Sequence, residues 1–193
     1  MIPVAVSARH VHLCPKTVQA LFGAGHTLHA RRAISQPDQF ASEECVTLDG
    51  PKGRLEGVRV VGPARAEDQV ELSRTDAIAL GIDAPVRESG DLAATPGITL
   101  RGPAGSVVLS QGVICSLRHV HMSPADAVVL DLKDQDQIEL SVLSGGRRMI
   151  FADVRVRVSP SFRLEFHVDT DEANAAGLKA HDVVHYAGKV RME

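Results

Sequence analysis

The chain has 193 residues, and its 44% hydrophobic and 23% charged residues match an ordinary globular protein and exclude general disorder. Its 21 basic against 24 acidic residues give a net charge of −3, which excludes nucleic-acid binding driven by overall charge. No apolar run approaches the roughly 20 residues that cross a bilayer, and residues 1–12 lack a signal-peptide pattern. We therefore expect a cytoplasmic protein without membrane or nucleic-acid partners.

Short helices and short strands alternate along the chain. In chain order, Pro, Ser and Gly at the expected ends predict helices over residues 15–22, 74–80, 124–130 and 171–176. Runs rich in branched residues, separated by Gly and Pro, predict strands over residues 55–61, 98–100, 106–109, 113–115, 138–143 and 154–158. The stretch 23–43 interrupts this pattern, and we interpret it as an inserted loop or hairpin that could cover a site.

The lengths of these elements indicate the fold class. No segment is long enough for the crossover helix of a parallel βαβ unit. Short strands at regular spacing are typical of small barrels and sandwiches. We therefore predict a mainly β fold of two small β-barrel domains capped by short helices.

A nine-residue motif occurs twice. The segment SARHVHLCP at 7–15 returns as SLRHVHMSP at 116–124, with six identical positions and a separation of 109 residues. A second similarity links Val70–Ser73 to Leu164–His167, and each of these segments precedes an expected helix that ends at a glycine. In this alignment Glu71 matches Glu165 and Ser73 matches His167, with small insertions between the copies. The chain is therefore interpreted as two diverged copies of one unit.

The repeated motif predicts two metal sites. In a strand, His-Val-His places both imidazoles on one face, where they can reach a single ion. One such motif is a weak signal, because two exposed strand histidines, or one histidine hydrogen-bonded in a core, explain it more often than a metal does. Its occurrence in both copies, while the surrounding sequence has changed, favours metal binding at His10 and His12 and again at His119 and His121.

Each site needs at least one further ligand. In the second copy we expect His167, which shares a strand face with Glu165. In the first copy Ser73 is a poor ligand, so we expect Glu71, with Glu88 as the rival. Three protein ligands leave positions open, as catalytic metals require, and two such ions could face one cleft.

Other reactive side chains have simpler interpretations. Arg9 and Arg118 alternate with the ligands and are expected to point away from the metals. Three thiols without a CxxC pair exclude a disulfide framework, and we interpret Cys14 and Cys115 as small buried thiols rather than nucleophiles. The remaining histidines are interpreted as ordinary side chains: His26, His29, His181 and His185.

Several longer motifs resemble one family over nearly the whole chain, from Ile2 to Gly177. These motifs are SARHVHL, SQPDQFASEE, VTLDGPKG, GPARAEDQVELSRTDA, APVRESGD, PGITLRGP, RHVHMSP and FHVDTDEANAAG. In this order they resemble the PduL-type phosphate propanoyltransferases, which are phosphotransacylases. The resemblance implies the interconversion of a short-chain acyl-CoA plus phosphate with acyl phosphate plus coenzyme A.

The resemblance also implies a site and a domain organisation. It implies two metal ions, normally zinc although other divalent ions are possible, between two barrel domains. One ion is expected on His10, His12 and Glu71, where the coenzyme A sulfur approaches, and the other on His119, His121 and His167. Arg65 matches the phosphate-contacting arginine of the family. The implied domains are a central barrel over 9–116, with the insertion 23–43, and a second barrel formed by 117–193 with an exchanged strand at 1–8.

The expected partners and location follow from the same resemblance. The partners are acyl-CoA, coenzyme A, phosphate and acyl phosphate, together with further copies of the chain in a homo-oligomer, for which a dimer is favoured. Relatives inside bacterial microcompartments carry an extra N-terminal segment, whereas the motif here begins at Ser7. We expect a free cytoplasmic enzyme, or a microcompartment enzyme if such a segment has been removed. The acyl chain, propanoyl or acetyl, stays open.

Two functions of other classes also fit the duplicated motif. An open zinc site activates water, so the chain could be a metal-dependent thioester or phosphoester hydrolase. A barrel with structural zinc and no catalytic activity is the other alternative.

Overall fold

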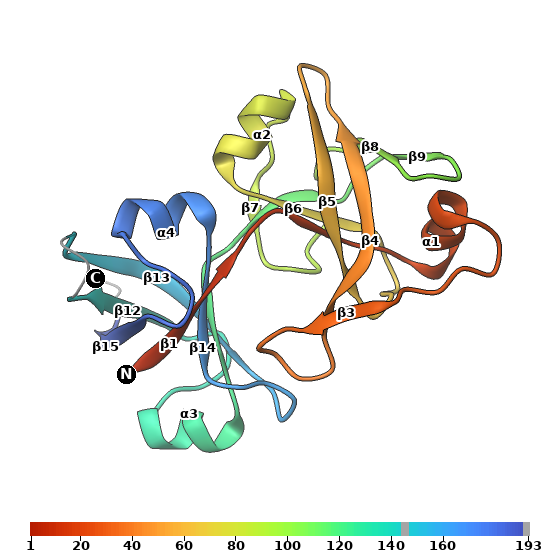
Figure 1. The fold of residues 1–193 in the computed structure, drawn as a ribbon. Coiled ribbons are helices and arrows are strands. Elements are labelled where there is room, and N and C mark those ends of the chain that lie inside the picture. Colours follow the sequence, from red (N-terminus) through yellow and green to blue (C-terminus); the bar gives the residue numbers. More distant parts are fainter. Residues whose placement is uncertain (144–146, 191–193) are drawn as a thin grey trace. The chain divides into compact units, whose positions relative to one another are not determined.

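The computed structural model describes residues 1–143 and 147–190, and the chain divides into two compact units (Figure 1). Unit 1 contains residues 1–7, residues 35–37 and the described residues from 117 onward. Unit 2 contains residues 8–34 and 38–116. That these units correspond to separate domains with the predicted boundaries stays a prediction.

Unit 1 is a closed six-stranded barrel with the strand order β1-β14-β11-β13-β12-β15. Its strands are β1 (Ile2–Ser7), β11 (His119–Met122), β12 (Gln137–Val142), β13 (Met149–Val158), β14 (Glu165–Asp169) and β15 (Val183–Lys189). The helices α3 (Pro124–Leu130) and α4 (Thr170–Ala176) follow β11 and β14. The core consists almost entirely of aliphatic side chains together with Phe151 and Phe166.

Unit 2 is a nine-stranded sheet that curls into a half-barrel, with the order β7-β10-β6-β2-β5-β4-β8-β9 and β3 paired to β4. Its strands are β2 (His10–His12), β3 (Ala30–Ala33), β4 (Phe40–Asp49), β5 (Arg54–Gly62), β6 (Gln69–Leu72), β7 (Val86–Arg87), β8 (Ile98–Arg101), β9 (Ser106–Leu109) and β10 (Val113–Ser116). Its helices are α1 (Pro15–Phe22) and α2 (Arg74–Leu80). The predicted insertion 23–43 contains β3 and the first residues of β4, which pair as an antiparallel hairpin.

The two units are built from the same parts with one strand exchanged. The strand before the second His-Val-His motif, β10, runs parallel to β6 in unit 2. The strand before the first motif, β1, runs parallel to β14 in unit 1, where β14 takes the place of β6. The prediction of a mainly β, duplicated fold with an exchanged N-terminal strand is therefore confirmed.

The helices have the predicted bounds, except that α4 begins one residue earlier, at Thr170. Its N-cap is Asp169, whose carboxylate accepts a hydrogen bond from the Glu172 amide. In the described part of the chain, none of the helices has the length and apolar character needed to span a membrane.

Candidate metal centres

The first cluster lies in unit 2, where β2 and β6 pair in antiparallel register. This register places His10 opposite Glu71, and the alternation of strand side chains brings His12 to the same face. The Nε2 atoms of His10 and His12 each lie 3.6 Å from Glu71 Oε1. The three side chains therefore present one ligand atom each within a small volume.

Backbone carbonyls orient both imidazoles of this cluster. His10 Nδ1 donates a hydrogen bond to the Ala8 carbonyl oxygen at 2.9 Å, and His12 Nδ1 donates to that of Val61 at 3.1 Å. A carbonyl only accepts, so each Nδ1 carries a hydrogen, and in the neutral form of each ring the lone pair lies on Nε2, on the side of Glu71. Three electron-rich atoms facing one another favour a cation between them, and two imidazoles with one carboxylate suit zinc. The donor set therefore fits the implied ion.

A polar network holds Glu71 in this position. Gln69 Nε2 donates to Glu71 Oε1 at 2.6 Å and also lies 2.8 Å from Ser89 Oγ. The Gly90 amide donates to Gln69 Oε1 at 2.8 Å, which fixes the orientation of the Gln69 amide. Such outer contacts orient a ligand and limit its movement.

Burial and mutual proximity shift the ionisation of this cluster. Burial lowers the pKa of His12 to about 4. Burial also lowers the pKa of His10, but the adjacent Glu71 carboxylate outweighs it and raises the pKa overall. Burial alone would raise the pKa of Glu71, yet the two imidazoles hold it well below its usual range. The carboxylate is therefore ionised at neutral pH, the state that a metal ligand requires.

The second cluster lies in unit 1, where β11 and β14 pair in antiparallel register. His119 stands opposite His167, and His121 shares their face. The ring centroids of His119 and His121 lie 4.6 Å apart, and those of His119 and His167 lie 4.9 Å apart in a stacked arrangement. His119 Nδ1 donates to the Leu117 carbonyl oxygen at 2.8 Å, as His10 does to Ala8. Three imidazoles with one ring oriented in this way fit a zinc ion.

Glu165 lies next to this cluster, at the position that Gln69 has beside the first cluster. Its Oε2 is 3.1 Å from His167 Nε2, and it accepts hydrogen bonds from Ser35 Oγ at 2.5 Å and Gln36 Nε2 at 2.9 Å. Burial raises the pKa of Glu165, but these three partners lower it to about 2. A carboxylate is thus available to orient His167. Phe162 stacks on the ring of His121 with centroids 3.9 Å apart.

The register corrects the predicted alignment of the two copies. His12 pairs with Gln69 and His121 pairs with Glu165, so Gln69 corresponds to Glu165, and Glu71 corresponds to His167. The match of Glu71 to Glu165 was therefore wrong. Ser73 corresponds not to His167 but to Asp169, and both residues are helix N-caps. The expected ligands Glu71 and His167 nevertheless occupy equivalent positions. The two residues of each corresponding pair are 96 positions apart in the sequence, so no insertion falls within this segment.

The arginines before the two motifs make equivalent structural ion pairs. Arg9 Nη1 lies 2.7 Å from Asp76 Oδ1, in the first turn of α2. Arg118 Nη1 lies 2.6 Å from Glu172 Oε1, in the first turn of α4. Each pair connects the residue just before β2 or β11 to the helix of the same unit, which gives the arginine a structural role in both copies.

Arg65 lies in the loop between β5 and β6. Its backbone amide donates to the Leu13 carbonyl oxygen at 2.9 Å, and Nη1 donates to Ser89 Oγ at 3.2 Å. Ser89 also contacts Gln69, so the guanidinium and Glu71 belong to one network. Among the described residues, the group of convergent ligand atoms in this part of unit 2 includes Glu71 and not its rival Glu88.

A third group of ligand atoms was missed by the sequence interpretation. His26, His29 and Glu44 also bring one ligand atom each within 4.8 Å of one another. The sequence pattern does not predict the strand that carries Glu44, so nothing in it connects this carboxylate with the two histidines.

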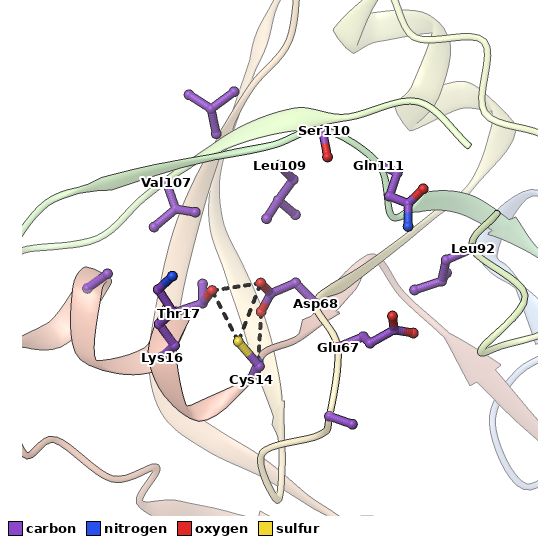
Figure 2. A pocket seen from close by; sticks show the side chains of 13 residues that line it. Cys14, Lys16, Thr17, Glu67, Asp68, Leu92, Val107, Leu109, Ser110 and Gln111 are labelled. Atoms are coloured by element: carbon purple, nitrogen blue, oxygen red, sulfur yellow. Dashed lines mark hydrogen bonds between the residues drawn. The ribbon is translucent and has the colours of Figure 1, made fainter. Parts of the chain in front are cut away.

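Cys14 lines a pocket of about 390 Å³ in unit 2 (Figure 2). The Cys14 sulfur lies 3.4 Å from Thr17 Oγ1 and 3.6 Å from Asp68 Oδ2. Figure 2 shows that these three polar side chains point toward one another, with Leu109 and Val107 also lining the pocket. Catalytic thiols are typically partnered by a histidine or held beside a cationic side chain, whereas the hydrogen-bond partners of this sulfur are a hydroxyl and a carboxylate. The surroundings of Cys14 do not favour a nucleophile.

Comparison with known proteins gives a consistent result. The model of the family described as phosphate propanoyltransferase matches residues 3–179. A phosphate propanoyltransferase of Thermotoga maritima is 54% identical over 184 residues, which cover 95% of this chain and 88% of the relative. Phosphate propanoyltransferases of Escherichia fergusonii and Salmonella typhimurium are each 51% identical over 176 residues, covering 91% of this chain and 83% of each relative.

Proposed function

The chain belongs to the phosphate propanoyltransferase family and is a phosphate acyltransferase. We propose that it transfers a propanoyl or acetyl group between coenzyme A and phosphate, and that it uses two bound metal ions to do so. In the proposed reaction, a phosphate oxygen attacks the thioester carbonyl carbon of acyl-CoA. The carbon–sulfur bond breaks, a carbon–oxygen bond to phosphate forms, and the proton of hydrogen phosphate ends on the coenzyme A sulfur. The products are acyl phosphate and free coenzyme A.

The convergence of ligand atoms in two equivalent clusters is the observation that carries this proposal. His10, His12 and Glu71 would hold one ion, and the other would be held by His119, His121 and His167. Bound zinc would supply Lewis acidity for the thioester carbonyl and a favourable partner for the departing thiolate. Three protein ligands at each cluster leave room for substrate atoms.

Arg65 is proposed to bind phosphate. A guanidinium offers a fork of N–H donors that matches phosphate oxygens and stays charged at every working pH. The hydrogen bond to Ser89 and the backbone bond to Leu13 hold this side chain and its loop in place. A positioned cation at this point lowers the cost of bringing a phosphate dianion to the carbonyl and of the charge that develops there.

No covalent acyl-enzyme is required by this proposal, because phosphate itself is the nucleophile. The surroundings of Cys14 agree with this, since the hydrogen-bond partners of its sulfur are Thr17 and Asp68 and not a histidine or a cationic side chain.

Phosphate dependence tests the proposal. We expect the purified protein to release coenzyme A from propanoyl-CoA and acetyl-CoA only when phosphate is present, and to form one acyl phosphate for each coenzyme A. Thiol titration follows the coenzyme A, and phosphorus NMR identifies the acyl phosphate. Release of coenzyme A at the same rate without phosphate would instead support a thioester hydrolase, and the proposal would be abandoned.

Gln69 is proposed to act as a positioning residue for Glu71. Gln69→Leu should keep a similar volume but remove the hydrogen bond to Glu71, which should weaken zinc binding by about 10- to 100-fold. Zinc affinity measured by competition with a chromophoric chelator checks this expectation. Gln111→Leu, at an exposed position of unit 2 outside the groups of ligand atoms, is the matched control and should bind zinc like the parent. Equal zinc affinity in Gln69→Leu and the parent would remove this role.

The assembly and the location stay proposals of the same kind. We propose a cytoplasmic homo-oligomer, with a dimer favoured. Light scattering of the purified chain gives the mass of the particle directly, and a monomeric mass at working concentrations would refute the assembly.

A further inference from the structure

A compact group of polar side chains lies in unit 2 where the segment after α1 passes beside β4. His26 Nε2 lies 2.8 Å from Glu44 Oε1, and His29 Nδ1 lies 2.7 Å from the same oxygen. The ring centroids of the two histidines are 5.1 Å apart and their planes are nearly perpendicular, at 78°. Both imidazoles therefore direct a nitrogen to one carboxylate oxygen.

Backbone hydrogen bonds hold these side chains close to one another. The His29 amide donates to both oxygens of Glu44, at 3.2 and 3.1 Å, and the Glu43 amide donates to the His29 carbonyl oxygen at 2.8 Å. The pairing of β3 with β4 continues directly beyond this point. On the other side, the Phe22 ring stacks on His26 with centroids 5.3 Å apart. The arrangement is thus built by several independent contacts rather than by the histidine–glutamate contacts alone.

The charge of this group is unbalanced. The Glu44 side chain is only 5% exposed, and among residues 1–143 and 147–190 its ion-pair partners are His26 and His29. Burial raises the pKa of Glu44, but hydrogen bonds from His29 and His26 lower it to about 2. Glu44 is therefore an ionised carboxylate, and when both rings are neutral the group carries one net negative charge that a divalent cation would offset.

We propose that His26, His29 and Glu44 form a third metal site, separate from the two clusters assigned to acyl transfer, which binds one zinc ion. The donor set, two imidazoles and one carboxylate, is the same as that of His10, His12 and Glu71. Bonds of about 2.0–2.2 Å to zinc place tetrahedral ligand atoms roughly 3.3–3.6 Å apart, so each imidazole nitrogen must move about 0.5–0.9 Å away from Glu44 Oε1. His29 is 60% exposed and has space to do so.

The consequence of binding is mechanical. An ion at this site would connect the segment between α1 and β3 to the middle of β4 and restrict the movement of that segment. The site has an exposed side, so we expect solvent to complete the coordination. The proposal does not depend on acyl transfer, and its failure would leave the proposed function untouched.

Zinc content measured on the full chain tests the proposal. His29→Asn removes the imidazole while leaving an amide that can still donate to Glu44. His181→Asn is the matched control, because His181 is exposed, lies outside all three groups and has a positive φ of 72°, which Asn tolerates. After equilibration at a fixed free Zn²⁺ concentration, elemental analysis gives the number of ions per chain. We expect one ion fewer in His29→Asn than in the parent, and no difference in His181→Asn.

A second measurement separates loss of the ion from loss of structure. Glu44→Gln should also bind one ion fewer, and circular dichroism should confirm that each variant is folded. Co²⁺ loaded in place of zinc should give visible absorption that decreases by the contribution of one site in His29→Asn. Coenzyme A release should be unchanged in this variant. Equal metal content in the parent and in folded His29→Asn would overturn the third site.

Discussion

His119→Ala is expected to reduce phosphate-dependent release of coenzyme A by more than about a hundredfold. His119 supplies one of three convergent imidazoles, and the hydrogen bond of its Nδ1 to the Leu117 carbonyl makes Nε2 the nitrogen that would bind a metal. Removing even an outer contact of a metal ligand costs about 10- to 100-fold, and removal of the ligand itself should cost more. Zinc content should fall by one ion per chain in parallel with activity.

The control for this variant is His185→Ala. His185 lies on β15 of the same unit, outside the groups of ligand atoms found in the described residues. Its activity and zinc content should equal those of the parent. Full activity in folded His119→Ala protein that has lost one ion would show that this cluster takes no part in the reaction.

Arg65→Ala is expected to lower the rate at saturating acyl-CoA by about 100- to 1000-fold, the cost of removing a charge-stabilising donor from a reacting site. The loss should include a raised KM for phosphate and little change in the KM for acyl-CoA. Arg65→Lys should recover part of the activity, because lysine keeps the charge but not the fork of donors. Zinc content should not change in either variant, which distinguishes this role from metal binding.

Arg74→Ala is the matched control for Arg65. Arg74 lies at the start of α2 and pairs with the exposed Asp83, and an exposed pair of this kind contributes little. We expect activity within about twofold of the parent. A normal phosphate KM and full rate in Arg65→Ala would remove the phosphate-binding role.

Local signals predicted the helices and the two histidine motifs well. Ser123 followed by Pro124 marks the start of α3, and Gly81 marks the end of α2, so these two helix ends could be placed from neighbouring residues alone. The same holds for the shared face of His10 and His12, which follows from the alternation of side chains along any strand.

Register could not be predicted in the same way. Matching Glu71 to Glu165 by residue type shifted one strand by two positions, because the pairing of β2 with β6 depends on distant hydrogen bonds. The shift kept the same strand face, which is why Glu71 and His167 were still chosen as ligands. The error also affected Ser73, which was aligned with the ligand His167 although it is the N-cap of α2.

The group around Glu44 was missed for a related reason. Glu44 lies in β4, whose first residues had been placed in an inserted loop or hairpin, and its ligand partners come from a segment without regular structure. Only the pairing of β3 with β4, together with the hydrogen bonds from the His29 amide, brings the three side chains together. No short sequence pattern encodes that arrangement.

Metal dependence tests the central claim most directly. Protein stripped of metal by a chelator, with removal verified by elemental analysis, should form no acyl phosphate from acyl-CoA and phosphate, and returned Zn²⁺ should restore the full rate. Undiminished, phosphate-dependent turnover by the verified metal-free protein would contradict the account.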